Sequence, residues 1–241
     1  MTESRKWIWQ PPAQSSIAII DRNGNRLAER LPVNRIFCVG RNYEAHAIEM
    51  NAELDREAPF YFTKTPSAIA CEVNSIPYPP GTENFHHEVE LVIALGANGF
   101  SVSKDEAAEL IFGYACGIDF TRRDLQNKAK EGRKPWDLSK DIESGAVISA
   151  VQQWPTDKPL RQARIELRVN GETRQDADIK LMVWNIHEII AHLSLFYHLT
   201  AGDLIYTGTP AGVGPVSVGD HIEASIANVG AVDLTIIEPL N

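Results

Sequence analysis

The chain has 241 residues, of which 44% are hydrophobic and 23% are charged, with 16 glycines and 14 prolines. This composition is typical of a globular protein with a sizeable core, and it excludes disordered, collagen-like and coiled-coil chains. Lys plus Arg number 23 against 32 Asp plus Glu, and the resulting net charge of −9 argues against nucleic acid or an anionic membrane as a partner.

The three cysteines, Cys38, Cys71 and Cys116, form no C-x-x-C pair. An odd number without such spacing predicts neither a disulfide framework nor a zinc site. The first stretch, 1–21, is interrupted by charges and prolines, and no apolar run is long enough to span a membrane. We therefore expect a cytoplasmic protein.

The predicted elements begin with a small N-terminal extension, residues 1–34. Its apolar run 17–20, followed by the turn Asn23-Gly24, predicts a hairpin or an edge strand. No internal repeat or long linker divides the rest of the chain. We expect residues 35–241 to form one α+β catalytic domain with a β-rich body and a few peripheral helices.

The first half of this domain combines strands with short helices. Ser103 and Glu106 match a capping box and predict a helix that ends near Gly113, and the stretch 43–50 also has helical character. Runs rich in β-branched and aromatic residues predict strands at 36–40, 60–63 and 88–95.

The second half is predicted to be mostly sheet. The runs 164–169 and 172–175 flank Asn170-Gly171, a pair that suits a type I′ hairpin turn. The stretch 185–199 has apolar residues at helical spacing, and strands alternate with Gly-Asp turns from Leu204 onwards.

Acidic residues at the start of the strand 88–95 are the first sign of chemistry. Alternation along a strand places Glu88 and Glu90 on one face, where their charges repel unless a cation offsets them. Asp119 ends another apolar run and is a candidate third ligand. Three carboxylates favour Mg²⁺ or Mn²⁺ over zinc. The alternatives are a solvated strand face for the glutamates and a helix N-cap for Asp119.

Three further features could take part in a site. His46 and Glu49 lie three residues apart on a predicted helix, either as an acid/base dyad or as a surface pair. The glycine-rich run 208–214 could hold a carboxylate with its backbone amides, or serve only as a turn. The segment after Asp119 is locally basic, which favours a dianionic small molecule over a merely solvated helix face. Its basic residues are Arg122, Arg123, Lys128, Lys130, Arg133, Lys134 and Lys140.

Four blocks in this order together resemble the fumarylacetoacetate hydrolase family, from about Arg35 to the end of the chain. They are Gly40-Arg41-Asn42-Tyr43 with His46 and Glu49; His86-His87-Glu88-Val89-Glu90; Asp119 to Gln126 with Lys140 downstream; and Gly208 to Gly214. The resemblance implies a mixed β-roll, a homodimer, and a Mg²⁺ or Mn²⁺ ion held by Glu88, Glu90 and Asp119.

Within that family the chain is most similar to acylpyruvate hydrolases. The resemblance implies hydrolysis of a C–C bond in a 2,4-dioxo acid, with fumarylpyruvate giving fumarate and pyruvate in the gentisate pathway of aromatic catabolism. His46 and Glu49 would activate water, and Lys140 and Gln126 would stabilise the oxyanion or enolate. The residues implied in substrate binding are Arg41, Tyr43, Arg123 and Thr209.

Other functions stay open at this point. Oxaloacetate decarboxylation, and isomerisation or decarboxylation of dienoic diacids, use the same family site, and a non-catalytic 2-oxo-acid-binding protein is an alternative of another class. One departure from the family bears on the substrate. Lys140 is followed by Asp141-Ile142-Glu143, where a small or apolar residue and a Phe are usual.

Overall fold

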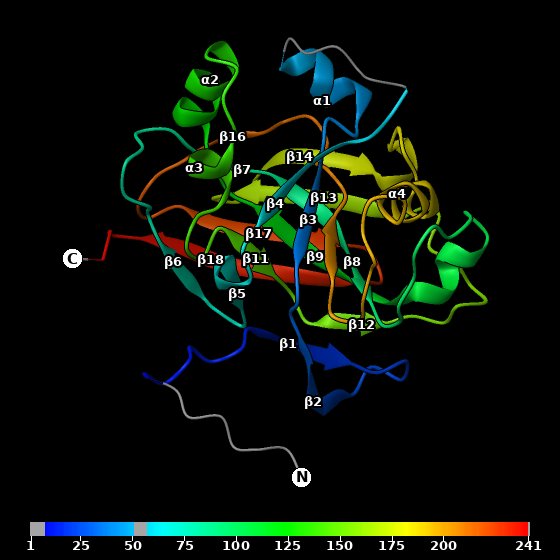
Figure 1. Ribbon diagram of the computed structural model, residues 1–241. Coiled ribbons are helices and arrows are strands. Elements are labelled where there is room, and N and C mark those ends of the chain that lie inside the picture. The colour runs from blue at the N-terminus through cyan, green and yellow to red at the C-terminus, as the bar shows by residue number, and fades with distance from the viewer. Residues whose placement is uncertain (1–7, 51–56, 241) are drawn as a thin grey trace.

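The computed structural model of the protein describes residues 8–50 and 57–240. Within these ranges the chain forms eighteen strands and four α-helices, with three short 3-10 helices in the connections (Figure 1). The strands are β1 Ser16–Ile20, β2 Arg26–Pro32, β3 Ile36–Gly40, β4 Phe60–Lys64, β5 Ile69–Cys71, β6 Ser75–Pro77, β7 Phe85–His87, β8 Val89–Leu95, β9 Ile111–Asp119, β10 Thr121–Arg122, β11 Ala146–Ile148, β12 Val151–Gln153, β13 Arg164–Val169, β14 Glu172–Asp178, β15 Leu204–Tyr206, β16 Gly214–Val216, β17 His221–Ile226 and β18 Gly230–Ile237. The helices are α1 Glu44–Glu49, α2 Arg123–Glu131, α3 Asp137–Lys140 and α4 Ile186–Leu193, and the 3-10 helices are Pro66–Ala68, Glu106–Leu110 and Ile179–Leu181.

The strands form three sheets, of which the two larger ones are mixed and the smallest is antiparallel. The largest has the order β2-β1-β12-β9-β8-β15-β3-β4, with β11 and β5 attached beside β9. A second sheet has the order β14-β13-β17-β18-β6, and a small third sheet is β10-β7-β16. Four pairs are parallel, β1 with β12, β5 with β11, β3 with β15 and β6 with β18. This arrangement confirms the predicted β-rich α+β fold.

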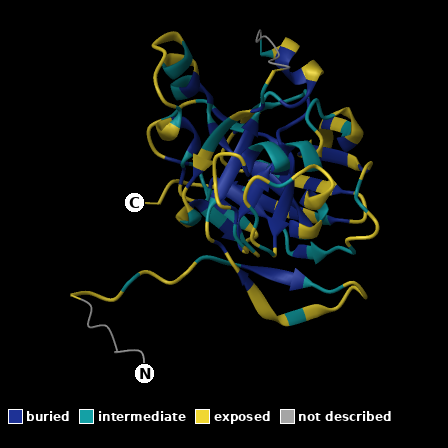
Figure 2. Cartoon of the chain, turned by 45° about the vertical axis from the view of Figure 1, so that its right-hand side comes forward, coloured by how far each residue is buried: buried dark blue, intermediate teal, exposed yellow. Residues whose placement is uncertain are grey.

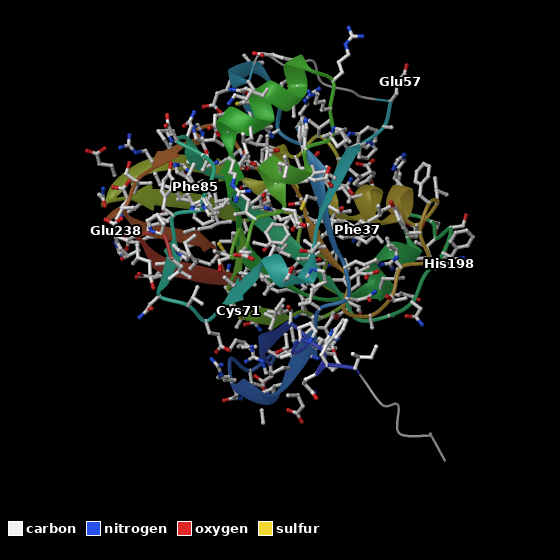
Figure 3. The ribbon with its side chains drawn as sticks, turned by 60° about the vertical axis from the view of Figure 1, so that its left-hand side comes forward. Phe37, Glu57, Cys71, Phe85, His198 and Glu238 are labelled. Carbon is white, nitrogen blue, oxygen red and sulfur yellow. The ribbon has the colours of Figure 1, made fainter. Side chains whose placement is uncertain are left out.

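Strand β8 lies at the centre of the core. All seven of its residues are buried, as expected for an almost continuously apolar strand covered on both faces. Val89 and Leu91 belong to the larger apolar cluster, whereas Val92 and Ala94 on the opposite face belong to a smaller one. The buried residues concentrate in this central region (Figure 2). Phe85 of the small sheet also lies inside the body, whereas side chains such as Glu238 and His198 lie at its edge (Figure 3).

The N-terminal hairpin is confirmed as β1 and β2, and it extends the large sheet through parallel pairing of β1 with β12. Ile17, Ile19 and Leu31 are buried in the smaller apolar cluster, so this hairpin is packed against the body. Helices α1, α2 and α3 lie at the opposite end of the sheets (Figure 1). Within the described residues, no helix is long and apolar enough to cross a membrane.

The structure corrects two of the predicted helices. The capping box at Ser103 and Glu106 forms, but it opens only the short 3-10 helix Glu106–Leu110. Gly113 lies within β9, because the run from Ile111 pairs with β8 instead of continuing a helix. The helix predicted within 185–199 is α4. It ends at Leu193, not Leu199, and its buried residues keep the predicted spacing.

The turn Asn170-Gly171 confirms the predicted hairpin, with both residues at positive φ, 53° and 81°. Gln175 follows on β14 and connects this hairpin to the large sheet. Its Oε1 accepts a hydrogen bond from the backbone N–H of Val89 at 3.0 Å, and its Nε2 donates to Thr209 Oγ1 and the Pro210 carbonyl, both at 2.8 Å. One fully buried amide therefore joins β14, β8 and the loop after β15.

Replacement of Gln175 by Leu should lower the free energy of unfolding by about 2–4 kcal/mol. The substitution leaves the Val89 N–H and the Pro210 carbonyl without partners, and each unsatisfied buried group costs about 1–3 kcal/mol. Urea denaturation measures the loss, with exposed Gln14→Leu as the matched control. Equal stability of the two variants would contradict this role of Gln175.

Candidate active site

The pairing of β8 with β9 brings three carboxylates together. Glu90 lies opposite Gly117, and the backbone N–H of Asp119 donates to the Glu88 carbonyl at 2.8 Å. Residues opposite each other in a sheet share a face, so Glu88, Glu90 and Asp119 point to the same side. Their carboxylate oxygens lie within 4.8 Å of one another, and all three residues are buried.

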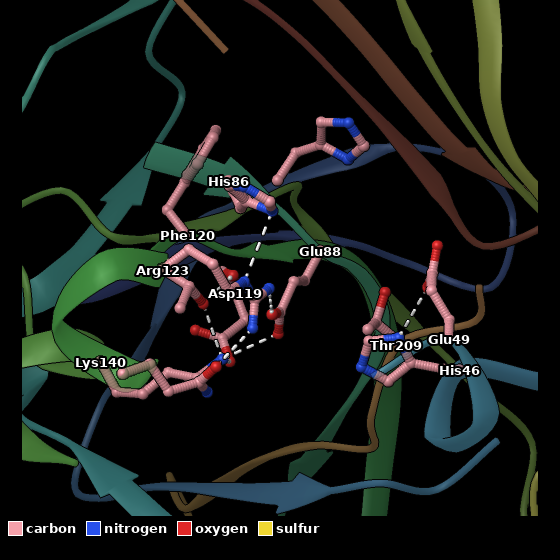
Figure 4. Close-up of polar contacts among 12 residues, drawn as sticks. His46, Glu49, His86, Glu88, Asp119, Phe120, Arg123, Lys140 and Thr209 are labelled. Carbon is pink, nitrogen blue, oxygen red and sulfur yellow. Dashed lines mark hydrogen bonds and ion pairs between the residues drawn. The ribbon is translucent and has the colours of Figure 1, made fainter. Parts of the chain in front are cut away.

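Buried cations surround two of these carboxylates (Figure 4). Lys140, at the end of α3, donates to Glu88 Oε2 at 2.8 Å, Asp119 Oδ2 at 2.6 Å and Thr121 Oγ1 at 2.7 Å. Arg123, at the start of α2, pairs with Glu88. Lys64, at the end of β4, lies 2.8 Å from Asp119 Oδ1. Each ion pair offsets part of the cost of burying these charges.

The neighbouring charges lower the pKa of Glu88 but raise the pKa of Glu90. Burial raises the pKa of Glu88, but the charges of Lys140 and Arg123 outweigh it and hold the pKa well below its usual range. Burial also raises the pKa of Glu90, and the neighbouring charges of Asp119 and Glu88 raise it further. Glu90 has no ion-pair partner in the described part of the chain, and its Oε2 accepts only the Gly208 N–H, at 2.8 Å.

These residues fit a divalent metal ion. The donor set consists only of carboxylate oxygens, which Mg²⁺ and Mn²⁺ prefer. Glu90, buried beside two other acids without a cation of its own, is the carboxylate whose charge such an ion would neutralise. The geometry therefore agrees with the predicted ligand set of Glu88, Glu90 and Asp119.

His46 and Glu49 lie on helix α1, with His46 Nδ1 3.2 Å from Glu49 Oε2. Burial lowers the pKa of His46, although the charge of Glu88 and the hydrogen bond to Glu49 oppose this. The imidazole is therefore neutral at neutral pH and can accept a proton. His46 lines the same cavity as Glu88 and Glu90, so the structure brings the dyad beside the carboxylate cluster.

The glycine-rich loop 208–214 holds two carboxylates of the protein itself. The Gly208 N–H donates to Glu90, and the Gly212 N–H lies 3.1 and 3.2 Å from the two carboxylate oxygens of Glu49. Both glycines have positive φ, and a Cβ on Gly212 would lie 2.0 Å from the Arg174 carbonyl oxygen. Only glycine fits there, which explains the composition of this loop.

The remaining predicted site residues divide into two groups. Arg41, Arg123, Gln126 and Thr209 line the cavity with the carboxylates. The Thr209 hydroxyl is engaged elsewhere, since it donates to the Val89 carbonyl at 2.9 Å.

Tyr43 is buried at the start of α1 and is absent from the residues that line this cavity. Within the described residues its hydroxyl has no hydrogen-bond partner. Burial raises the pKa of Tyr43, with further contributions from Glu90 and Asp178. Tyr43 therefore does not line the cavity itself, although its hydroxyl is close enough to feel the charge of Glu90, and its part in substrate binding stays a prediction.

Lys64 is the site residue that the sequence patterns missed. Its side chain is fully buried and donates to the carbonyl oxygens of Phe120 and Gly145, both at 3.2 Å, in addition to pairing with Asp119. The only signal in the sequence is a lysine directly after the apolar strand 60–63.

Asp141 is the unusual residue after Lys140. Its carboxylate accepts hydrogen bonds from the backbone N–H and the hydroxyl of Thr65, the residue directly after β4.

Comparison with known proteins identifies the class. The family model described as fumarylacetoacetate (FAA) hydrolase, C-terminal, matches residues 35–237. The chain belongs to this family, as the four sequence blocks predicted.

Three relatives illustrate the similarity. A fumarylpyruvate hydrolase from Ralstonia sp. is 48% identical over 180 residues, which cover 75% of this chain and 93% of that protein. The human protein named oxaloacetate tautomerase FAHD1, mitochondrial, is 37% identical over 204 residues, or 85% of this chain and 92% of that one. The crystal structure of fumarylpyruvate hydrolase from Pseudomonas aeruginosa in complex with Mn²⁺ and pyruvate has a TM-score of 0.91 and 37% identity, covering 97% of this chain and 100% of that one.

Substitution of Glu90 by Gln should weaken Mn²⁺ binding by roughly tenfold or more. Mutation of residues that only hydrogen-bond to metal ligands already causes a loss of this size. The metal-free variant should stay folded, because removing one acid relieves repulsion with Asp119 and Glu88. Mn²⁺ titrations followed by thermal unfolding measure both effects. The control is Glu238→Gln, at an exposed position. Unchanged Mn²⁺ affinity would exclude Glu90 as a ligand.

Proposed function

We propose that this protein is a metal-dependent hydrolase that cleaves a C–C bond of a 2,4-dioxo acid, converting fumarylpyruvate into fumarate and pyruvate. The observation that carries the proposal is the dyad His46–Glu49 beside three clustered carboxylates, in a chain 48% identical to a fumarylpyruvate hydrolase. The related Pseudomonas structure in complex with Mn²⁺ and pyruvate supports the metal and the pyruvate half of the substrate.

Glu88, Glu90 and Asp119 would hold Mg²⁺ or Mn²⁺. When bound, such an ion supplies a Lewis acid for the oxygens of a 2-oxo acid. Lys140 fixes the ligands, because its three ammonium donors go to Glu88, Asp119 and Thr121. Desolvation lowers the pKa of Lys140, but the charges of Asp119 and Glu88 raise it overall, so the group stays charged.

The dyad accounts for activation of water. Glu49 is fixed by the Gly212 amide and orients His46 through Nδ1, which leaves His46 Nε2 to accept a proton. Water loses that proton as its oxygen bonds to the C4 carbonyl carbon. The C3–C4 bond then breaks, its electron pair forms the enolate of pyruvate, and His46 returns the proton to C3. The carboxyl group formed at C4 loses its proton to solvent, which gives fumarate and pyruvate.

Gln126 is the group that can stabilise the oxyanion at C4. Its Oε1 accepts a hydrogen bond from Arg123, which leaves Nε2 without a protein partner among the described residues. This differs from the expectation that Lys140 shares the role, since the donors of Lys140 are occupied. Arg123 pairs with Glu88 and also lines the cavity, where it can contact a substrate carboxylate. Arg41 and the backbone of Thr209 complete the proposed binding groups.

A second candidate function is conversion of oxaloacetate. The relatives named oxaloacetate tautomerase support it. Both substrates share a 2-oxo acid end, but oxaloacetate needs no attacking water. The two functions therefore differ in their dependence on the dyad.

We propose a cytoplasmic homodimer of the gentisate pathway, with residues 1–34 as an extension and 35–241 as the catalytic domain. Three cysteines without disulfides agree with a reducing compartment, and the family model begins at residue 35. Light scattering of the purified protein tests the dimer.

Product analysis of the purified, metal-stripped protein tests the activity. Fumarylpyruvate, acetylpyruvate and oxaloacetate are offered with and without Mn²⁺. We expect metal-dependent release of fumarate and pyruvate from fumarylpyruvate, faster than turnover of the other two. Consumption of oxaloacetate alone would overturn the hydrolase assignment in favour of the second candidate.

Replacement of Glu49 by Gln should lower kcat for fumarylpyruvate by about 10²-fold or more, the usual contribution of an acid/base group. In the wild-type protein the rate should fall only below pH 6.5, because the pKa of His46 is lowered and its neutral form is the base. Loss of Glu49 removes an interaction that raises this pKa, so the acid limb should move to lower pH.

The control for this pH profile is exposed Glu29→Gln, which should match the wild type. An acid limb that keeps its position in Glu49→Gln would contradict the coupling of Glu49 to His46.

A further inference from the structure

A second, larger cavity opens beside the carboxylate cluster. Its volume is about 480 Å³. Arg41, Phe62, Lys130, Trp136 and Lys140 line both this outer cavity and the inner one that contains Glu88 and Glu90. The two cavities therefore adjoin, and a ligand held at the carboxylates can reach the outer cavity.

The wall of the outer cavity is unusually basic for a chain of net charge −9. Four of its cations make no ion pair within residues 8–50 and 57–240, namely Arg41, Lys130, Arg133 and Lys134. Asp137 is the one acidic residue among the described residues that line it, and it is exposed. Cations that converge on a concave surface create a positive potential that attracts an anion.

Helix α2 explains why Lys130 is central among these cations. Arg123, Gln126 and Lys130 are spaced i, i+3 and i+7, so they share one face of the helix. Arg123 contacts Glu88 and Gln126, and Lys130 lies four residues further along, about 6 Å from Gln126 along the helix axis. Lys128, by contrast, is exposed.

Aromatic rings form the flat part of this wall. Phe60 and Trp136 pack edge to face with centroids 5.0 Å apart, and Lys130 Nζ lies 5.5 Å from the centroid of Trp136. Arg41 lies 5.9 Å from the ring of Phe60 in the same way. The cavity thus combines flat apolar surfaces with cations at their edges, a combination that suits a planar acyl chain ending in a negative charge.

The environment of Lys130 also favours an anionic ligand. Burial, together with the charges of Arg123 and Arg41, lowers the pKa of Lys130 to about 8, against the opposing charge of Glu88. The ammonium group is thus partly desolvated and lacks a counter-ion among the described residues. A carboxylate bound beside it would supply that counter-ion.

We propose that the outer cavity binds a terminal carboxylate on the acyl group of the substrate, with Lys130 as the residue that determines preference for a diacid over a neutral acyl chain. This inference rests on the proposed function, and it assigns the acyl end of that same site. Phe60 and Trp136 would pack against the planar unsaturated chain, and Arg41 and Arg133 would add positive charge around the carboxylate.

The test compares Lys130→Gln, Lys130→Arg and the exposed control Lys128→Gln in the Mn²⁺-loaded protein. Fumarylpyruvate carries the terminal carboxylate and acetylpyruvate lacks it. Lys130→Gln should lower the ratio of kcat/KM for fumarylpyruvate to that for acetylpyruvate by about 10–100-fold, through KM, as expected for a lost charged hydrogen bond. Lys130→Arg should keep most of the ratio, and Lys128→Gln should keep all of it.

An equal loss on both substrates, or an unchanged ratio, would overturn the assignment of Lys130. If the wild type cleaves neither substrate, the proposed function fails and intact fumarylpyruvate can be titrated by calorimetry. Binding at least tenfold weaker in Lys130→Gln than in Lys128→Gln would still support the carboxylate site. Equal affinities would exclude it.

Discussion

The structure depends on charge compensation around three buried carboxylates. Glu88, Glu90 and Asp119 would repel one another in a medium of low dielectric constant if no cations were close. Lys64 comes from β4, Arg123 from α2 and Lys140 from α3, so three separate elements must dock against β8 and β9 to supply the positive charge. The peripheral helices are thus tied to the sheet by electrostatics as well as by apolar packing.

Rigid placement of the reacting groups follows from the sheet. Apolar residues on both faces of β8 anchor it in two clusters, and its register with β9 sets the positions of the acids at one end. Gln175 connects the second sheet to this end through four short contacts. A site built on paired central strands is held more precisely than one built on surface loops.

Much of the fold and part of the site could be predicted from local patterns. The run 88–95, the turn Asn170-Gly171 and the acids at 88, 90 and 119 carry strong signals of strand, hairpin and ligand chemistry. The contact of Lys64 with Asp119 joins residues 55 positions apart, and no local pattern indicates it. The predicted helix after Ser103 was wrong because pairing with β8 outweighed a correct capping signal. Tyr43 was grouped with the site by motif; it does not line the cavity, and its part in substrate binding stays a prediction.

The loop 208–214 has a consequence for how this site can change. It fixes Glu90 through Gly208 and Glu49 through Gly212, so four peptide units set the spacing between the cluster and the dyad. That end of the site is specified mainly by backbone amides and strands, whereas the outer cavity is specified by side chains of β4, α2 and the segment between α2 and α3. The carboxylate end and the outer cavity are therefore built from largely different structural elements. New acyl groups can be accommodated by exchanging outer side chains while the bond-breaking apparatus stays intact.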